Sequence, residues 1–252
     1  MNSQEIQNGK NQAGLNANAL KLIAIVAMTI DHLTWTFMPG FDQAALPVLL
    51  HCIGRMTAPI MFFFIAEGYH YTKDLGKYIK RMLIFAILSH FAYALCFGGT
   101  FIPFQNGMIF SQTSIIWSLM WGLIALAVAK SEDPRMTKAI KWLLVIGCVL
   151  ISLPADWSAA APMAIVLVGL NRGDFKKQML GIFIPVALYA AGYAIFFNVT
   201  YGLVQLAVAL SFPFLYTYNG ARGKWNGMKW LFYIYYPLHM TILGLIRVFW
   251  LN

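Results

Sequence analysis

The residues of this sequence with the clearest chemical potential are ionisable side chains set within long apolar stretches. They are Asp31, His32, Arg55, Glu67, His90 and His239, with His51 nearer one end of its stretch. A charge near the centre of a bilayer costs on the order of a few kcal/mol, so such groups face the interior of a helix bundle. Histidine accepts and returns a proton near neutral pH, and arginine stabilises a developing negative charge. These residue types favour acid–base chemistry or solute binding within a membrane.

The composition agrees with a membrane setting. The chain has 252 residues, of which 60% are hydrophobic and only 11% charged. Soluble domains carry roughly a quarter charged residues, so a water-soluble globule is excluded. The net charge of +9 does not indicate a nucleic-acid partner, because the basic residues lie in short loops rather than on a soluble face. We expect one integral membrane domain over residues 20–252. A mobile cytoplasmic tail over residues 1–19, without the apolar core of a signal peptide, precedes it.

Apolar stretches of about 20 residues predict membrane-spanning helices. We expect an all-α, polytopic bundle with about nine spans, at residues 20–38, 46–68, 79–97, 113–129, 140–155, 159–170, 178–197, 202–218 and 230–250. The stretch 159–170 is short, and Pro154 and Pro162 flank a broken or re-entrant helix, which would raise the count to ten. Irregular backbone at that depth is tolerated only against protein or a water-filled cavity.

The loops between these stretches predict the orientation. Sixteen of the 18 basic residues lie at the amino end or in every second loop: Lys10, Lys21, Lys73, Lys77, Lys80, Arg81, Lys130, Arg135, Lys138, Lys141, Arg172, Lys176, Lys177, Arg222, Lys224 and Lys229. The alternate loops, 39–45, 98–112, 156–158 and 198–201, hold none. Because basic loops stay in the cytoplasm, we expect a bacterial inner-membrane protein with a cytoplasmic amino terminus and an external carboxyl terminus.

Depth along the helices groups some of the ionisable residues. At about 1.5 Å per residue, His32, His90, His239 and Arg55 lie roughly 18, 16, 14 and 16 Å from the cytoplasmic side. We expect these four to share a layer near the midplane. Asp31 points roughly 100° away from His32 around the helix, so a partner for the imidazole should come from another helix. Arg55 could pair with Asp31 and hold the first two spans together.

Other kinds of site find no support in the sequence. It contains no phosphate-binding loop of Walker type, and its histidines and cysteines lack the spacing of metal ligands, so we expect no metal. Cys52, Cys96 and Cys148 lie within apolar runs without CxxC spacing, and we interpret them as small buried apolar residues.

Several motifs are similar to those of a known family. LKLIAIVAMTIDH, from Leu20 to His32, resembles the start of the TraX family, which is associated with acetylation of conjugative pilin. The stretch from Ile53 to His90 resembles that family's GR…P…F…EG…T…Y block, and Pro154 to Trp157 resembles an outer-loop motif. The ending from Asn219 to His239, NGARGKWNGMKWLFYIYYPLH, resembles its carboxyl-terminal motif. The resemblance spans nearly the whole chain.

A wider resemblance implies a reaction. Lys21 and His32 are separated by ten residues, which resembles the basic-x10-His pattern of membrane acyltransferases of the acyltransferase type 3 superfamily. Members usually have one more span than we count here. The resemblance implies transfer of an acetyl group from cytoplasmic acetyl-CoA, with His32 as the general base. The acceptor would be the amine of a pilin or peptide, or a group on an envelope glycan or lipid.

The expected roles follow from this reaction. His32 would take the acceptor proton, Arg55 and His239 would stabilise the oxyanion or orient the acyl group, and Asp31 would belong to the same catalytic cluster. Basic side chains suit the phosphates of CoA. The candidates for donor binding are Lys21, Glu67, Lys73, Arg81, His90 and Lys224.

Two other functions remain open. Ionisable groups at the midplane also build the sites of small-molecule or proton-coupled transporters. We see no internal repeat of the kind that transporters contain, which counts against this alternative. A non-catalytic scaffold for pilus or envelope assembly would need large exposed loops, and these are missing.

Overall fold

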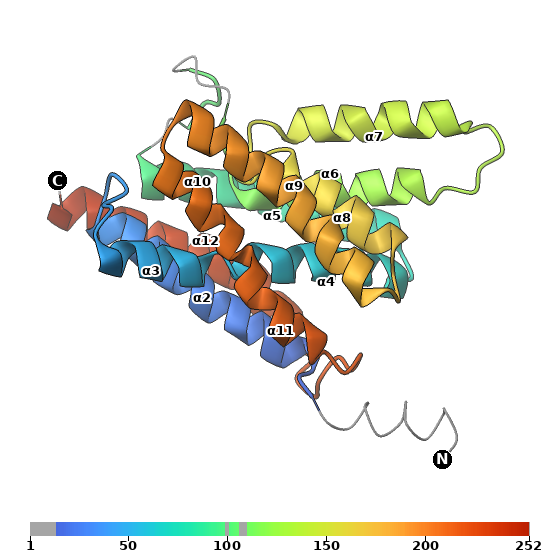
Figure 1. Ribbon diagram of the computed structural model, residues 1–252, viewed down its shortest axis with the longest axis horizontal. Coiled ribbons are helices and arrows are strands. Elements are labelled where there is room, and N and C mark those ends of the chain that lie inside the picture. Colours follow the sequence, from blue (N-terminus) through green and yellow to red (C-terminus); the bar gives the residue numbers. More distant parts are fainter. Residues whose placement is uncertain (1–13, 99–100, 106–109, 252) are drawn as a thin grey trace.

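The computed structural model describes residues 14–98, 101–105 and 110–251, and within these ranges it is all-helical (Figure 1). The elements, in chain order, are α2 (Ala17–Phe37), α3 (Ala45–Gly54), α4 (Thr57–Tyr71), α5 (Leu75–Phe97), α6 (Ile115–Ala129), α7 (Lys138–Ser152), α8 (Ala160–Leu170), α9 (Phe175–Phe196), α10 (Val199–Gln205), the 3-10 helix η1 (Leu206–Ser211), α11 (Phe212–Tyr216), α12 (Met228–Ile246) and the π-helical turn η2 (Arg247–Leu251).

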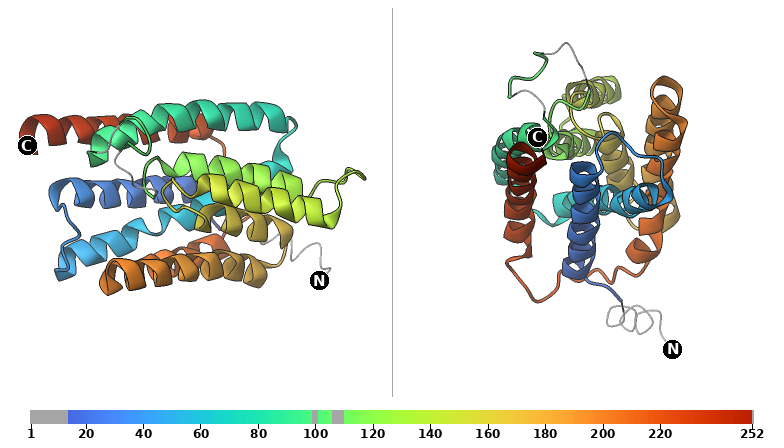
Figure 2. Two further views of the ribbon diagram at one scale, coloured as in Figure 1. Left: turned by 90° about the horizontal axis from the view of Figure 1, so that it is seen from above. Right: turned by 90° about the vertical axis from the view of Figure 1, so that its left-hand side faces the viewer.

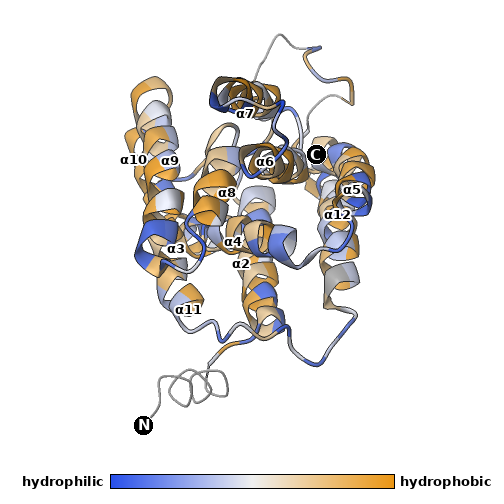
Figure 3. Ribbon diagram, turned by 90° about the vertical axis from the view of Figure 1, so that its right-hand side faces the viewer, coloured by the Kyte–Doolittle hydropathy of each residue, from blue (hydrophilic) through white to orange (hydrophobic). Residues whose placement is uncertain are grey.

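The all-α prediction is confirmed, and each predicted span coincides with a helix or a run of helices. Within the described residues, six segments are long and apolar enough to cross a membrane: Ala17–Phe37, Ala45–Tyr71, Leu75–Phe97, Phe175–Phe196, Val199–Tyr216 and Trp230–Leu251. Ile115–Ala129 and Ala160–Leu170 are shorter apolar helices. The chain is thus a multi-pass membrane protein, whereas nine crossings stays a prediction. Most residues of the helices have hydrophobic side chains, as the colouring by hydropathy in Figure 3 indicates.

The amino-terminal helix begins earlier than predicted. Asn16 caps α2 by accepting a hydrogen bond from the Ala19 backbone N–H at 3.0 Å, so Ala17 is already helical. Leu15 pairs with Tyr218 in an isolated bridge that joins this end of α2 to the segment before α12. Of the predicted tail, residues 1–13 lie outside the described residues.

The second predicted span, 46–68, is two helices rather than one. α3 ends at Gly54, Arg55 and Met56 form the break, and α4 starts at Thr57. Pro59 explains the break, because proline has no N–H and its ring collides with the carbonyl of the residue four positions earlier, which is Arg55. The interruption places Arg55 in the joint between two helices.

The helices run side by side along the long axis of the molecule (Figure 2). The loops 72–74, 130–137, 171–174 and 217–227 lie at the end where α2 begins, which we call the basic end. Loop 38–44 and the described parts of the loop between α5 and α6, residues 101–105 and 110–114, lie at the other end, the far end, together with the turn η2. The loops alternate between the two ends as the charge pattern predicts.

Helix α8 occupies the centre of the bundle, and α7 lies outermost. α8 packs against α4, α6 and α9, and eight of its 11 residues are buried. α7 packs mainly on α6 (Figure 1). The loop 153–159 between α7 and α8 turns back nearer the middle of the molecule than the other far-end loops. The break expected near Pro154 and Pro162 is therefore this loop, and Pro162 itself lies in the first turn of α8.

Candidate functional site

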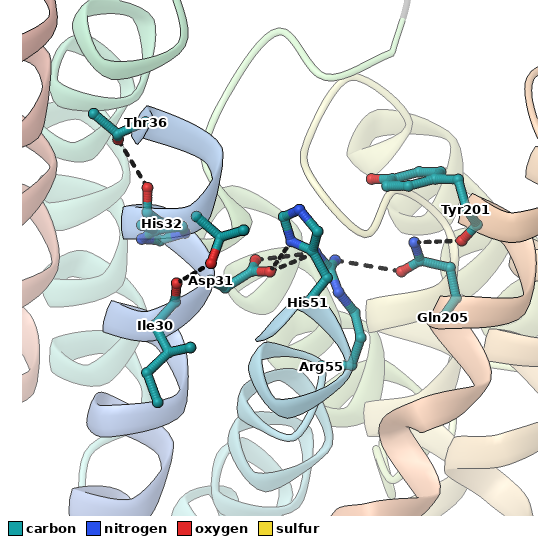
Figure 4. A network of polar contacts seen from close by, with 9 residues as sticks. Ile30, Asp31, His32, Thr36, His51, Arg55, Tyr201 and Gln205 are labelled. Carbon is teal, nitrogen blue, oxygen red and sulfur yellow. Dashed lines mark hydrogen bonds and ion pairs between the residues drawn. The ribbon is translucent and has the colours of Figure 1, made fainter. Parts of the chain in front are cut away.

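A network of buried charges joins α2 to α3 at the helix break (Figure 4). Arg55 donates from Nη2 to both carboxylate oxygens of Asp31, at 2.9 and 3.0 Å, and from Nη1 to Oε1 of Gln205 at 3.3 Å. His51 lies 2.8 Å from the same carboxylate through Nδ1. All four side chains are buried. The predicted pairing of Arg55 with Asp31 is confirmed, and the joint between α3 and α4 positions the guanidinium for it.

His51 belongs to this network although the sequence assigned it no role there. It lies four residues before Arg55, so the two side chains share one face of the chain as it approaches the break. This spacing was the signal that could have identified it. The rings of Trp35 and Phe41 lie against His51, with centroid distances of 4.7 and 5.6 Å. These rings hold the imidazole against Asp31.

His32 finds its partner on α12. Its Nδ1 lies 2.7 Å from Nε2 of His239, and the two rings stack with centroids 5.0 Å apart and planes 11° from parallel. His239 places its own Nδ1 2.7 Å from the backbone carbonyl of Tyr235. The expectation that the partner of His32 comes from another helix is confirmed.

This chain of contacts assigns the ring protons of the neutral pair. The carbonyl of Tyr235 can only accept, so Nδ1 of His239 carries a proton and donates to it. Nε2 of His239 is then an acceptor, so Nδ1 of His32 must be the donor. The remaining nitrogen, Nε2 of His32, carries a free lone pair. This nitrogen is the one that can accept a proton from a bound molecule.

Two adjoining cavities meet at His32. The central cavity has about 40 Å³ and is lined on α4, α6 and α12 by Ala58, Ile115 and Tyr236. The far-end cavity has about 250 Å³ and is lined by four aromatic side chains: Trp35, Tyr93, Phe97 and Tyr201. Both cavities are lined by Asp31, His32, Arg55 and Asp156. These shared residues form the boundary between the two spaces.

A third cavity extends from the basic end. It has about 250 Å³, with Lys21 and Arg81 among its polar lining residues and apolar side chains of α4, α6 and α12 as its walls. Met61 lines it three residues beyond Ala58, and Tyr233 lines it three residues before Tyr236. Three residues correspond to a rise of about 4.5 Å. The basic-end cavity therefore approaches the central cavity to within about one helical turn.

The predicted donor-binding residues do not all line this cavity. Lys21 and Arg81 do, and each ammonium or guanidinium also lies over an aromatic ring, that of Phe64 for Lys21 and those of Tyr78 and Tyr233 for Arg81. Lys73 and Lys224 are exposed at the basic end and lie outside its lining. Two of the four basic candidates thus lie where a ligand in the cavity could meet them.

Glu67, one of the predicted donor-binding residues, pairs with a basic loop residue. Its Oε1 accepts from Nε of Arg172 at 2.8 Å, and Arg172 also donates to the Tyr71 hydroxyl at 3.1 Å. The hydrogen bond to Glu67 raises the pKa of the Arg172 guanidinium. The pair ties the end of α4 to the loop between α8 and α9, beside the mouth of the basic-end cavity.

His90 does not join the layer in which depth alone placed it. Its Nε2 lies 2.9 Å from the backbone carbonyl of Phe101, in the loop that follows α5. It lines a separate apolar cavity with Trp117 and Leu150, between α5, α6 and α7. Of the four residues predicted for the layer, His32, Arg55 and His239 come together and His90 lies apart.

The cysteines contribute no group to the site. Cys96 and Cys148 are buried, Cys52 is half-buried, and all three are free thiols. Among the described residues, no three histidine, cysteine, aspartate or glutamate side chains are grouped to hold a metal ion.

Comparisons with known proteins agree with the arrangement of motifs. A probable fimbrial assembly protein, FimC of serogroup H1 from Dichelobacter nodosus, is 25% identical over 240 residues, which cover 93% of this chain and 96% of that protein. No solved structure matches the chain significantly. The model of the TraX protein family matches residues 16–247, a range that contains all of the side chains described above. The chain belongs to the TraX family.

Proposed function

We propose that the protein is a membrane acetyltransferase that moves an acetyl group from acetyl-CoA in the cytoplasm to an amine or hydroxyl acceptor. The observation that carries the proposal is the free Nε2 of His32, located where cavities from the two ends of the bundle approach each other. A base at this point can reach a donor that enters from one end and an acceptor that enters from the other.

The basic-end cavity suits the donor. Phosphate groups of CoA would remain near Lys21 and Arg81, and the apolar walls would surround the pantetheine arm. Lys21 and His32 are 11 residues apart on α2, a rise of about 16 Å, which is comparable to the length of an extended pantetheine arm. The thioester would then lie in the central cavity beside His32 and Arg55.

The reaction needs no groups beyond those that line the central cavity. Nε2 of His32 takes the proton of the acceptor as the acceptor nitrogen or oxygen bonds to the thioester carbonyl carbon. Arg55 stabilises the oxyanion, and its Nε, buried without a partner among the described residues, is a donor that such an oxyanion could use. Collapse of the intermediate breaks the carbon–sulfur bond. The proton on His32 passes to the CoA thiolate, so free CoA and the acetylated acceptor leave.

The name of the relative indicates where to seek the acceptor. FimC is described as a probable fimbrial assembly protein, so the amino terminus of a fimbrial or pilus subunit is one candidate. An envelope glycan, lipid or peptide fits the same chemistry. Because cavities also approach His32 from both ends, a small-molecule or proton-coupled transporter is the alternative function.

Acetylation in cells tests the proposal even while the acceptor is unidentified. The gene is deleted and restored as wild type, as His32→Ala, or as His70→Gln, a histidine on α4 outside the three cavities. Mass spectrometry of envelope fractions should find an acetylated species that disappears on deletion and returns with wild type and His70→Gln. It should stay absent with His32→Ala at equal protein level.

Two results would reject parts of the proposal. Full acetylation by the His32→Ala variant would exclude this residue as the base. An acetylation pattern that is the same with and without the gene would reject the transferase, and uptake of a labelled solute by proteoliposomes would then favour the transporter.

A further inference from the structure

Asp156 is a half-buried carboxylate for which the reaction above has no role. It lies in the loop 153–159 between α7 and α8, and it lines the central and far-end cavities together with His32 and Arg55. None of the ion pairs found among the described residues includes it. Asp31, the other carboxylate of these cavities, is already bound by Arg55 and His51. Asp156 is therefore the carboxylate available to a molecule in the cavity.

The loop holds Asp156 in one position. The Asp156 backbone N–H donates to the Thr113 carbonyl at 2.9 Å, and its carbonyl accepts from the Ser118 hydroxyl at 3.0 Å. Its Oδ1 accepts from the Trp157 backbone N–H at 3.0 Å. These bonds fix both the backbone and one carboxylate oxygen, which leaves Oδ2 for an external partner.

The two residues that follow Asp156 adopt an unfavourable backbone conformation. Trp157 and Ser158 have φ values of 60° and 41°, in the left-handed region that non-glycine residues rarely occupy. Both are buried, and the Trp157 ring packs on Phe62, on Tyr189 and over the Arg55 guanidinium. Such strain costs on the order of 1–3 kcal/mol per residue and persists where the surroundings enforce it, often at functional sites. Here the strained turn presents Asp156 to the cavities.

The surroundings of Asp156 identify the side from which a ligand would reach it. The far-end cavity has aromatic walls and reaches Ser111 in the loop before α6. The basic side chains Lys21 and Arg81 line the other cavity, at the opposite end of the bundle. A carboxylate repels the phosphates of CoA and attracts N–H and O–H donors, so Asp156 suits the acceptor rather than the donor.

We propose that Asp156 is the acceptor-positioning residue, which accepts a hydrogen bond from the nucleophilic N–H or O–H group and orients it toward Nε2 of His32. This role rests on the proposed acetyltransferase function. Asp156 keeps its carboxylate throughout and forms no covalent bond, while His32 alone takes the proton that the acceptor loses. The acceptor class is therefore a hydrogen-bond-donating nucleophile, an amine or a hydroxyl, that enters from the far end.

Binding of small probes tests the role apart from the reaction. The full chain in lipid nanodiscs is titrated, without acetyl-CoA, with alanine amide as the amine probe and methyl glucoside as the hydroxyl probe. Asp156→Asn retains the oxygen that accepts from Trp157 but lacks the charge. It should weaken binding of the preferred probe about tenfold, the loss expected for a charge-assisted hydrogen bond. Affinity for acetyl-CoA should stay within about twofold of wild type.

The matched control is Asp42→Asn, an exposed aspartate in the far-end loop whose Oδ1 accepts from the Ala44 backbone N–H. It should bind both probes and acetyl-CoA as wild type does. Where the wild type transfers acetyl groups, Asp156→Asn should raise the KM for the acceptor and leave that for acetyl-CoA unchanged.

Three results would overturn the role of Asp156. They are unchanged probe binding by Asp156→Asn, an equal loss of affinity for probe and for acetyl-CoA, and a wild-type protein that binds neither probe. If the wild-type protein bound a probe through Asp156 but transferred no acetyl group, the result would reject the acetyltransferase function and support the binding site.

Discussion

His32 on α2 and His239 on α12 share a hydrogen bond of 2.7 Å between stacked rings. The bond joins two helices that are separated by almost the whole chain, and the carbonyl of Tyr235 determines its direction. In the proposed reaction His239 would be a positioning residue, because this contact keeps the proton of His32 on Nδ1 and the lone pair on Nε2. The sequence led us to expect instead that His239 stabilises the oxyanion or orients the acyl group, and both remain predictions.

Replacement of His239 tests this division of roles. His239→Leu removes the acceptor for Nδ1–H and should lower kcat about tenfold to hundredfold, because an unpaired buried donor costs about 1–3 kcal/mol. His239→Gln places an amide oxygen near the same position and should recover part of the rate. Single-turnover kinetics with radiolabelled acetyl-CoA measure both. A His239→Leu variant with normal kcat and a raised KM for acetyl-CoA would contradict the positioning role.

Variants of the Arg55–Asp31 pair should distinguish its contribution to stability from its contribution to activity. Removal of one partner leaves a buried charge, so Asp31→Asn or Arg55→Met should each lower the free energy of unfolding by about 3–5 kcal/mol. The double variant Asp31→Leu/Arg55→Met replaces both charges by apolar groups and should regain much of that loss. Thermal unfolding in detergent measures these changes.

The same double variant should be folded and inactive, because it lacks the guanidinium that we propose stabilises the oxyanion. Acetylation by this variant at the wild-type rate would show that the pair only joins α2 to α3.

The size of the central cavity should limit the acyl chain. Its volume of about 40 Å³ holds a few small groups, because one water needs roughly 10–15 Å³ of such space, and an acetyl group has three heavy atoms. We expect wild type to prefer acetyl-CoA to butyryl-CoA by more than tenfold in kcat/KM, since one methylene can be worth about 1–3 kcal/mol. Ile115→Ala enlarges the cavity and should reduce the preference. Equal use of both donors by wild type would contradict this prediction.

The lining of the basic-end cavity predicts which lysines and arginines bind the donor. Lys21→Ala and Arg81→Ala should each raise the KM for acetyl-CoA about fivefold to thirtyfold, the effect of losing one charge-assisted contact of roughly 1–2 kcal/mol. Lys176→Ala, an exposed lysine on α9 at the same end, is the control with the same loss of charge. If all three variants raised the KM for acetyl-CoA equally, the effect would come from the overall electrostatic potential of the basic end rather than from contacts in the cavity.

Much of the fold could be predicted because its signals are local. The length of each apolar stretch and the alternation of basic loops depend on neighbouring residues only, and they identified all of the helices that build the site. The helix break at Arg55 was also encoded locally, by Pro59, but the apolar character of 46–68 concealed it. The mean hydropathy of a stretch depends only on which residues it contains, so it does not reveal where a backbone hydrogen bond is missing and the helix breaks.

The site could be predicted only in part, because depth along a helix does not give direction around it. His32 and His90 have similar predicted depths, yet His32 turns toward α12 while His90 turns toward the loop after α5. For Asp156, the predicted depth itself was wrong. Its position in a loop predicted an outer turn, but the short helix α8 lets that loop fold back to the cavities. Both outcomes depend on how distant segments pack.

The approach of cavities from both ends has an electrical consequence. Where water enters cavities from each side of a membrane protein, the membrane voltage falls mainly across the thin partition between them, and moving one elementary charge through 100 mV amounts to about 2.3 kcal/mol. An unpaired arginine in that partition would experience a force that changes whenever the membrane potential changes. Arg55 sits there bound to the carboxylate of Asp31, and the opposing forces on the two charges largely cancel. The Arg55–Asp31 pair therefore responds little to the membrane voltage, so the joint between α3 and α4 should keep its geometry while the membrane potential changes.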